Sequence, residues 1–455
     1  MRIALMSATW TQEQILALAP DASSAKNGKA LATSRKWSSL GYNEKATWGE
    51  CQGSGKKPYL TEIDLTEPAF KCSCPSRKFP CKHGIALFLL FINEKQLFAQ
   101  NSPPEWVHQW LEARSQRQVK KEEKVKTEEK TKKEIDPEAQ AKRAAKRLDK
   151  VTAGMQDLEV WLRDLVSNGL AAAQEKPYSY WDDAFSRLVD AQAPGVARLV
   201  KEMASISHSG AGWQERLLSQ LGRVYLLTEA FKRLDTLPKQ VQTDIRTQIG
   251  FSQNQQELSA QQGIDDSWLI LGQSLTEEDR LKIQRTWLWG KQTQQKALIL
   301  NFAHGKQPLD TSLVPGSCIN AELVFFESAY PLRAIAKTRQ DAVTQIDTMP
   351  GYSNISSMVI EYSQALAKNP WIEQFPASMR RVIPIKQNDS WFIRDEDKRL
   401  LTLKSRFKNN WQLLALSGGY PIDIFGEWDG EYFLPLSIWV ENRFINFGFW
   451  ILDYK

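Results

Sequence analysis

Cysteine and histidine are scarce in this sequence, which has only five cysteines and four histidines among 455 residues. Long apolar runs are missing too: the longest, residues 85–92, is far shorter than the roughly 18 residues typical of a membrane-spanning helix. Residues 1–13 contain too little apolar sequence for a signal peptide. We therefore expect a cytoplasmic protein without a membrane span, in a reducing compartment where disulfides are rare.

Patterns of catalytic residues are also missing. His304 and Cys318 stand alone in the sequence, with no pattern of a triad, a carboxylate pair or a second metal site around them. The glycine-rich stretch 53–57 carries Lys56 and Lys57 but lacks the spacing of a phosphate-binding loop, and no long helix follows it. We expect this stretch to connect a β-hairpin, and we expect no enzymatic activity.

The few cysteines are concentrated in one place. Three of them and one histidine fall within residues 72–83, with the spacing C-x-C-x6-C-x-H: Cys72, Cys74, Cys81 and His83. Residues i and i+2 of a strand point to the same face, so the first two cysteines can reach one ion. Pro75 and Pro80 allow the chain to turn back, and an apolar helix follows. Three thiolates and one imidazole form a common closed ligand set for structural zinc, so we predict one Zn²⁺ here.

The alternatives for these cysteines are a disulfide or free thiols. Cys72 and Cys74 are poorly placed to bond to each other, because side chains at i and i+2 diverge from disulfide geometry. A Cys/His cluster in a reducing compartment favours a metal. Cys51 lies outside the motif, and it is either a small buried apolar side chain or a neighbour of the metal site.

The C-x-C-xn-C-x-H motif is the signature of the SWIM zinc finger. With the flanking residues 18–24 and 48–55, the chain resembles bacterial SWIM zinc finger family proteins of similar length. This resemblance implies zinc binding, a ββα finger, and a role in binding DNA or other proteins. It also suggests a protein partner, since some members are associated with MoxR-type AAA+ ATPases and von Willebrand A-domain proteins.

Positive charge is concentrated around the motif. Residues 1–134 contain 22 Lys and Arg against 15 Asp and Glu, a balance of +7, whereas the remaining residues contain 37 against 38, a balance of −1. The cations nearest the motif are candidate contacts for nucleic acid or an acidic partner: Lys56, Lys57, Lys71, Arg77, Lys78 and Lys82. The alternative is that these cations are solvated and stabilise the zinc–thiolate centre, whose net charge is −1.

The sequence predicts an α+β multidomain protein with four consecutive parts. These are an N-terminal ββα zinc finger domain at 1–111, a charged flexible linker at 112–136, a helical bundle at 137–255, and a mostly antiparallel β domain at 256–455. Within these parts, the sequence predicts a helix, or a helix followed by a loop, over residues 22–40. It also predicts a Trp106/Trp110 helix that packs back on the finger domain, and helices at 277–283 and 356–367.

Three functions are compatible with this organisation. The first, which we favour, is a binding or adaptor protein whose finger takes part in protein–protein interaction. The second is a DNA- or RNA-binding protein that uses the basic finger surface, and salt-sensitive binding would distinguish it. The third is an enzyme with its site in the C-terminal body. On any of these readings, replacing Cys74 or His83 is expected to unfold residues 48–95 alone.

Overall fold

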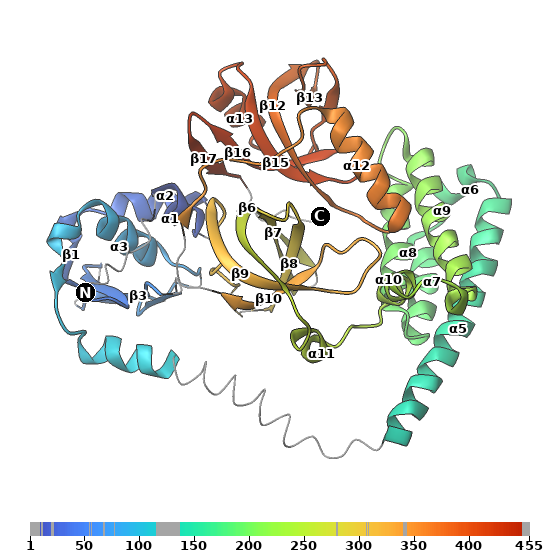
Figure 1. The fold of residues 1–455 in the computed structure, drawn as a ribbon, viewed down its shortest axis with the longest axis horizontal. Helices are drawn as coiled ribbons and strands as arrows, with labels where there is room; N and C mark the ends of the chain where they lie inside the picture. Colours follow the sequence, from blue (N-terminus) through green and yellow to red (C-terminus); the bar gives the residue numbers. More distant parts are fainter. Residues whose placement is uncertain are drawn as a thin grey trace.

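The computed structural model has three folded parts, with a β body lying between an N-terminal domain and a helical bundle (Figure 1). It describes residues 10–447 except 11, 20–21, 54, 56, 67–68, 77, 115–136, 279–280, 306, 308 and 340–343. Residues 112–114 end a helix that spans residues 105–114, and the rest of the expected linker lies outside the described residues. Within the described ranges, no helix combines the length and apolarity that crossing a membrane requires.

The N-terminal domain is a five-stranded sheet in the order β4-β3-β2-β1-β5, covered by three helices. The strands are β1 (Trp37–Tyr42), β2 (Ala46–Cys51), β3 (Tyr59–Asp64), β4 (Ala69–Cys72) and β5 (Ala99–Gln100), and the helices are α1 (Gln12–Ala17), α2 (Ala22–Leu31) and α3 (Lys82–Asn93). Nine consecutive α3 residues, from His83 to Phe91, are buried. A helix that is apolar all round must lie inside the protein, and α3 forms the centre of this domain.

The predicted ββα unit is present here as β3, β4 and α3, within a larger sheet. Of the helix, or helix followed by a loop, predicted over residues 22–40, helix α2 ends at Leu31. The prediction was wrong from Trp37, because the chain enters β1 there and pairs with β2. The helix at residues 105–114 packs back on the sheet as expected, through Trp106 but without Trp110, which is half-buried outside this contact cluster. There Trp106, Val107 and Leu111 contact Ala46 and Trp48.

The second part is the helical bundle. It consists of α5 (Pro137–Ser167), α6 (Leu170–Gln174), α7 (Tyr178–Asp190), α8 (Pro194–Ile206), α9 (Trp213–Lys232) and α10 (Lys239–Ile249), and the short α11 (Gln255–Ser259) follows it. Its core is continuous and includes Val151, Leu158, Trp181 and Leu221. The predicted helical periodicity of this region is confirmed.

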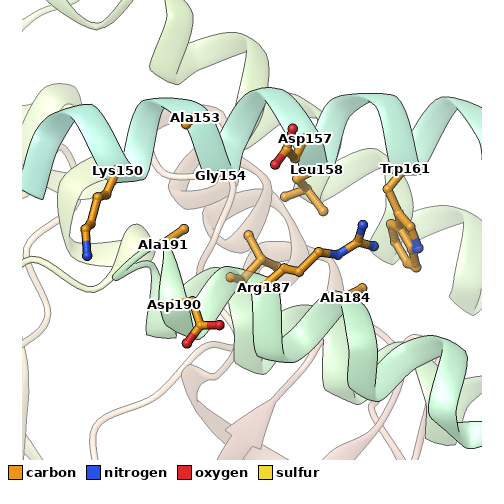
Figure 2. A pocket seen from close by; sticks show the side chains of 11 residues that line it. Lys150, Ala153, Gly154, Asp157, Leu158, Trp161, Ala184, Arg187, Asp190 and Ala191 are labelled. Atoms are coloured by element: carbon orange, nitrogen blue, oxygen red, sulfur yellow. The ribbon is translucent and has the colours of Figure 1, made fainter.

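Helix α5 packs against the C-terminal end of α7 at Gly154, which lies opposite Ala191, the residue that follows α7, in Figure 2. A Cβ atom built on Gly154 would lie 2.3 Å from the Ala191 Cβ, closer than packed carbon atoms allow. A cavity of about 240 Å³ extends along the two helices from this contact, past Leu158 and Trp161. The glycine therefore sets the separation of the two helices.

We expect Gly154→Ala to destabilise the bundle and Gly222→Ala, on α9, to stabilise it. In a helix interior, alanine stabilises the folded state by about 1 kcal/mol relative to glycine. At Gly154 an overpacking cost of about 1–3 kcal/mol outweighs this gain, whereas no atom lies within 4 Å of a Cβ at Gly222. Urea unfolding followed by hydrogen exchange of the bundle amides measures both changes. Equal stabilisation by the two variants would show that α5 and α7 are not in contact at Gly154.

The third part, the β body, contains two sheets and is mostly antiparallel, as predicted. The first has the order β10-β9-β6-β7-β8, with β11 paired to β9. Its strands are β6 (Ile264–Glu278), β7 (Leu281–Gly290), β8 (Lys296–His304), β9 (Ser317–Phe325), β10 (Ala334–Arg339) and β11 (Thr344–Gln345). The sheet curls until β8 meets the start of β10, where Leu298 N–H donates to Leu332 O at 2.7 Å.

The second sheet has the order β14-β13-β12-β15-β16-β17. Its strands are β12 (Phe375–Gln387), β13 (Ser390–Arg394), β14 (Leu400–Thr402), β15 (Ile422–Trp428), β16 (Phe433–Val440) and β17 (Arg443–Asn446). Helices α12 (Ile355–Lys368) and α13 (Asn410–Ser417) accompany it. On β6, Leu269 and Leu271 join the core shared by both sheets, whereas Trp268 and Ile270 fill the curl of the first sheet. This alternation follows from the two-residue period of a strand.

The prediction of a helix at residues 277–283 was wrong, because these residues lie in the β6–β7 hairpin. Residues 277–283 are mostly polar. Elsewhere in the same hairpin, buried polar side chains form hydrogen bonds to each other across the paired strands. The Gln273 side-chain amide donates to Thr286 Oγ1 at 2.8 Å, and both side chains are buried. Polar residues in such a long hairpin do not produce the apolar alternation expected of a half-buried strand.

A buried lysine connects the first sheet to α12. Lys296 on β8 is 5% exposed, and its ammonium donates to Glu361 Oε1 on α12 and to the Tyr352 hydroxyl. The same ammonium lies 4.9–5.0 Å from the ring centres of Trp289, Tyr352 and Phe375. Burial lowers the pKa of Lys296. The carboxylate and the three aromatic rings together offset the cost of burying this cation.

The bundle docks on the β body through the segment between α12 and β12. Trp371 is buried within the bundle core, and its indole N–H donates to Arg223 O at 3.3 Å. In the opposite direction, from the bundle to this segment, the Arg223 guanidinium donates to Ile372 O at 3.3 Å. Arg198 of the bundle forms an ion pair with Glu373. These contacts hold the two parts together as one packed unit.

Candidate metal centre

The β3–β4 hairpin positions the first two ligands. Cys72 ends β4 and lies opposite Thr61 of β3 in the ladder. The Thr61 hydroxyl is 3.3 Å from Cys72 Sγ, within hydrogen-bonding distance of the sulfur. Cys74 follows two residues later, and both cysteines are half-buried. The hairpin therefore presents two sulfur atoms toward the helix that follows in the chain.

Helix α3 positions the other two ligands. Cys81 is its N-cap residue, and His83 lies in its first turn and is 5% exposed. The next turns of α3 are fully buried, so its start is fixed in place by the domain core. The helix N-terminus also favours a negatively charged sulfur at Cys81, because its free N–H groups point toward that end.

The four side chains converge as the spacing predicted. One ligand atom from each of Cys72, Cys74, Cys81 and His83 lies within 4.8 Å of all the others. His83 Nδ1 is 3.7 Å from Cys72 Sγ and 3.9 Å from Cys81 Sγ. A tetrahedral zinc with ordinary Zn–S and Zn–N bond lengths separates its ligand atoms by about 3.6–3.8 Å. The donor set and its dimensions therefore fit one structural zinc ion.

The electrostatics of the cluster also suit a cation. A hydrogen bond from Cys72 lowers the pKa of Cys81 to about 4, with further help from His83 and the Gly84 N–H. That hydrogen bond, together with burial, raises the pKa of Cys72, and burial raises the pKa of Cys74. Three sulfurs this close cannot all be thiolates without a compensating charge. A divalent cation supplies that charge when it binds.

Cys51 is close to the cluster but is not part of it. It is fully buried at the end of β2. Burial raises the pKa of its thiol, and the nearby Cys81 and Cys74 raise it further, while Lys82 and Lys36 lower it. Both interpretations of this residue are therefore correct: Cys51 is a small buried side chain and a neighbour of the metal site.

Residues outside the motif complete the surroundings of the site, and local sequence gave no sign of them. The ring of Tyr59 lies 4.9 Å from the ring of His83. Glu62, the residue after Thr61 on β3, is almost fully buried on the opposite face of the strand, and burial raises the pKa of its carboxyl to about 7. Strand pairing between β3 and β4 brings Thr61 and Tyr59 to the ligands. Sequence spacing alone cannot reveal that pairing.

The six candidate contact cations do not have equivalent surroundings. Lys71 pairs with the buried Glu62, with Nζ 2.9 Å from Oε1. Lys57, Lys78 and Lys82 are exposed. Lys56 and Arg77 lie outside the described residues. Lys71 therefore has a structural role in the hairpin that the sequence did not indicate.

The loop between the two ligand pairs exposes an aromatic side chain. Phe79 is 49% exposed and packs edge-on against Phe70, with ring centres 6.4 Å apart. It lies between Lys78 and the buried Pro80. The loop between the ligands Cys74 and Cys81 thus presents the Phe79 ring to solvent next to Lys78.

Comparison with protein families identifies two segments of the chain. Residues 71–91, which contain all four ligands, match the SWIM zinc finger. Residues 146–249, which run from α5 to α10, match the SWIM-associated four-helix bundle domain. No curated protein and no solved structure matches the chain.

Proposed function

We propose that this chain, which carries a SWIM zinc finger and a SWIM-associated four-helix bundle domain, is a non-catalytic adaptor whose finger binds a protein partner. Cys72, Cys74, Cys81 and His83 fill all four positions of a tetrahedral site. A zinc ion held in this way has no open position for water or substrate, so its role is structural. The finger then serves to hold a binding surface in shape.

The observation that carries the proposal is the exposure of Phe79 on the clipped loop. Large apolar side chains that are exposed on rigid loops are typical anchors of protein interfaces. The loop is fixed at both ends, by Cys74 on one side and Cys81 on the other. An anchor held in this way loses little conformational entropy on binding.

Nucleic-acid binding by the finger is the second candidate, supported by the exposed Lys57, Lys78 and Lys82. Basic groups beside an exposed aromatic ring also suit a single-stranded nucleic acid. The pairing of Lys71 with Glu62 removes one cation from this surface and weakens that case. A protein partner is therefore favoured. The resemblance to SWIM proteins suggests a cytoplasmic system with a MoxR-type AAA+ ATPase and a von Willebrand A-domain protein.

Two variants distinguish the candidates. Phe79→Ala is expected to abolish retention of a purified MoxR-type ATPase partner on the immobilised full chain, while the protein keeps one zinc. Lys57→Ala with Lys82→Ala is expected to change that retention less than about threefold, because exposed charges contribute little binding energy. Wild-type protein is expected to show no binding to a 20-base single-stranded RNA or a 20-base-pair DNA at 150 mM salt.

The opposite pattern would overturn the protein-binding proposal. In that pattern, the wild type binds nucleic acid tightly, and the affinity falls steeply with salt. The double lysine variant binds nucleic acid more weakly, and Phe79→Ala does not change ATPase retention. Zinc content is measured for every variant, so that loss of the fold is not mistaken for loss of a contact.

A further inference from the structure

A cavity of about 460 Å³ lies where the bundle meets the β body. Residues of α8, α10 and the segment after α10 line one side, and residues 326–333 and 369–374 line the other. Its volume is in the range of small-molecule sites, which are common at junctions between domains. The cavity is separate from the zinc finger, in both sequence and structure.

Much of the wall is apolar and aromatic. The apolar lining consists of Phe251, Trp287, Leu298, Phe326, Leu332, Trp371 and Ile372. Trp287 is held in position because its indole N–H donates to the buried Glu427 carboxylate at 2.9 Å. Flat rings fixed in this way are suited to hold a flat apolar ligand.

The carboxylates on the wall already have partners. Asp244 accepts a hydrogen bond from the Ala329 N–H at 2.8 Å. Glu327 accepts one from Thr243 Oγ1 at 3.2 Å, and Glu373 pairs with Arg198. These acids are therefore engaged within the protein and do not call for a cationic ligand.

Arg333 differs from the other charged groups of the cavity. Its guanidinium stacks on Phe326, 4.3 Å from the ring centre. Among the described residues, its side chain makes no hydrogen bond and no ion pair. Burial lowers the pKa of Arg333, and no carboxylate acts on it in the opposite direction. A half-buried guanidinium with five N–H donors normally has an oxyanion partner.

We propose that this cavity binds a small organic oxyanion, with Arg333 holding a carboxylate or phosphate group and the aromatic wall holding a flat apolar body. A guanidinium can donate two parallel hydrogen bonds to either group. Phe326 orients the plane of the guanidinium, and Trp287, Phe251 and Trp371 contact the apolar body. The inference does not depend on what the finger binds.

Calorimetric titration of the full chain tests this site with three probes that share one ring system. These probes are 1-naphthoate, 1-naphthyl phosphate and the cationic 1-naphthylmethylammonium. At least one anion is expected to bind with one site per chain, and the anion that binds identifies the oxyanion that the site prefers. The cation is expected not to bind, because the wall offers no carboxylate without a partner.

Arg333→Gln is expected to weaken binding of that anion by about 10- to 100-fold, because it removes a charge-assisted bidentate contact. Arg246→Gln is the matched control: Arg246 is exposed on α10 and does not line the cavity, so affinity should stay within about twofold. Arg333→Lys keeps the positive charge but cannot donate two parallel hydrogen bonds, so the affinity of this variant for the anion should be intermediate. Thermal unfolding of each variant verifies that it is folded.

Three results would overturn the proposal. The first is the absence of saturable binding of either anion up to 1 mM. The second is binding of the cationic probe as tight as that of the anions. The third is unchanged affinity in Arg333→Gln or, if that variant does not fold, in Arg333→Lys.

Discussion

Replacing Cys74 by serine is expected to unfold residues 48–95 while the bundle and the β body stay folded. The substitution removes one of four ligands that converge within 4.8 Å. Binding of structural zinc contributes about 10–16 kcal/mol in isolated fingers, comparable to the whole stability of a domain. Without the bound zinc ion, Cys72 at the end of β4 and Cys81 at the start of α3 are no longer held together.

Hydrogen exchange resolved along the chain measures this effect. Protection of α3 and β3 is expected to fall by several orders of magnitude, and protection of α5–α10 and of β6–β17 is expected to remain. Cys318→Ser is the matched control, because Cys318 is a buried cysteine of β9 in a different core. That variant should retain full protection in the finger. Collapse of protection across the whole chain in Cys74→Ser would show that the parts do not fold independently.

Trp371→Ala is expected to separate the bundle from the β body, at a cost of about 3–5 kcal/mol, the usual range for deleting a buried tryptophan. The side chain is 5% exposed and lies among bundle residues, although it belongs to the β body in sequence. Its removal also eliminates the hydrogen bond to Arg223 O. The contacts that remain, such as the Arg198–Glu373 pair, are partly exposed and worth much less.

The expected signature of Trp371→Ala is faster exchange in α8–α10 and a larger radius of gyration in small-angle scattering. Trp411→Ala provides the control with the same change in side chain. Trp411 is 65% exposed on α13, so its loss should cost less than about 1 kcal/mol. Equal effects of the two substitutions would show that Trp371 is not the anchor of this junction.

The zinc site could be predicted from sequence because its ligands lie within twelve residues and their identities define the chemistry. The surroundings of the site could not. Thr61 and Tyr59 reach it through the pairing of β3 with β4, a contact between strands that no local pattern encodes. Phe79 was part of the motif region, but its exposure depends on how the loop folds back.

In the β body, too, some features could be predicted from sequence and others could not. Strands such as β12 and β16 and helix α12 had clear periodicity and were predicted. The β6–β7 hairpin was predicted as a helix in part, because residues 277–283 are mostly polar and lack the apolar alternation of a half-buried strand. The cavity at Arg333 combines residues from α8, from residues 244–255, from β7 and β8, and from residues 326–333 and 369–374. These segments are far apart in sequence, and only the packing of the bundle on the β body brings them together.

The most direct test of the account is the metal content of the purified full-length chain. Elemental analysis after dialysis is expected to give one zinc per chain for the wild type and for Cys318→Ser, and almost none for Cys74→Ser. A wild-type protein without zinc, or a Cys74→Ser variant that retains a full equivalent, would contradict the assignment of Cys72, Cys74, Cys81 and His83 as the ligands of one structural ion.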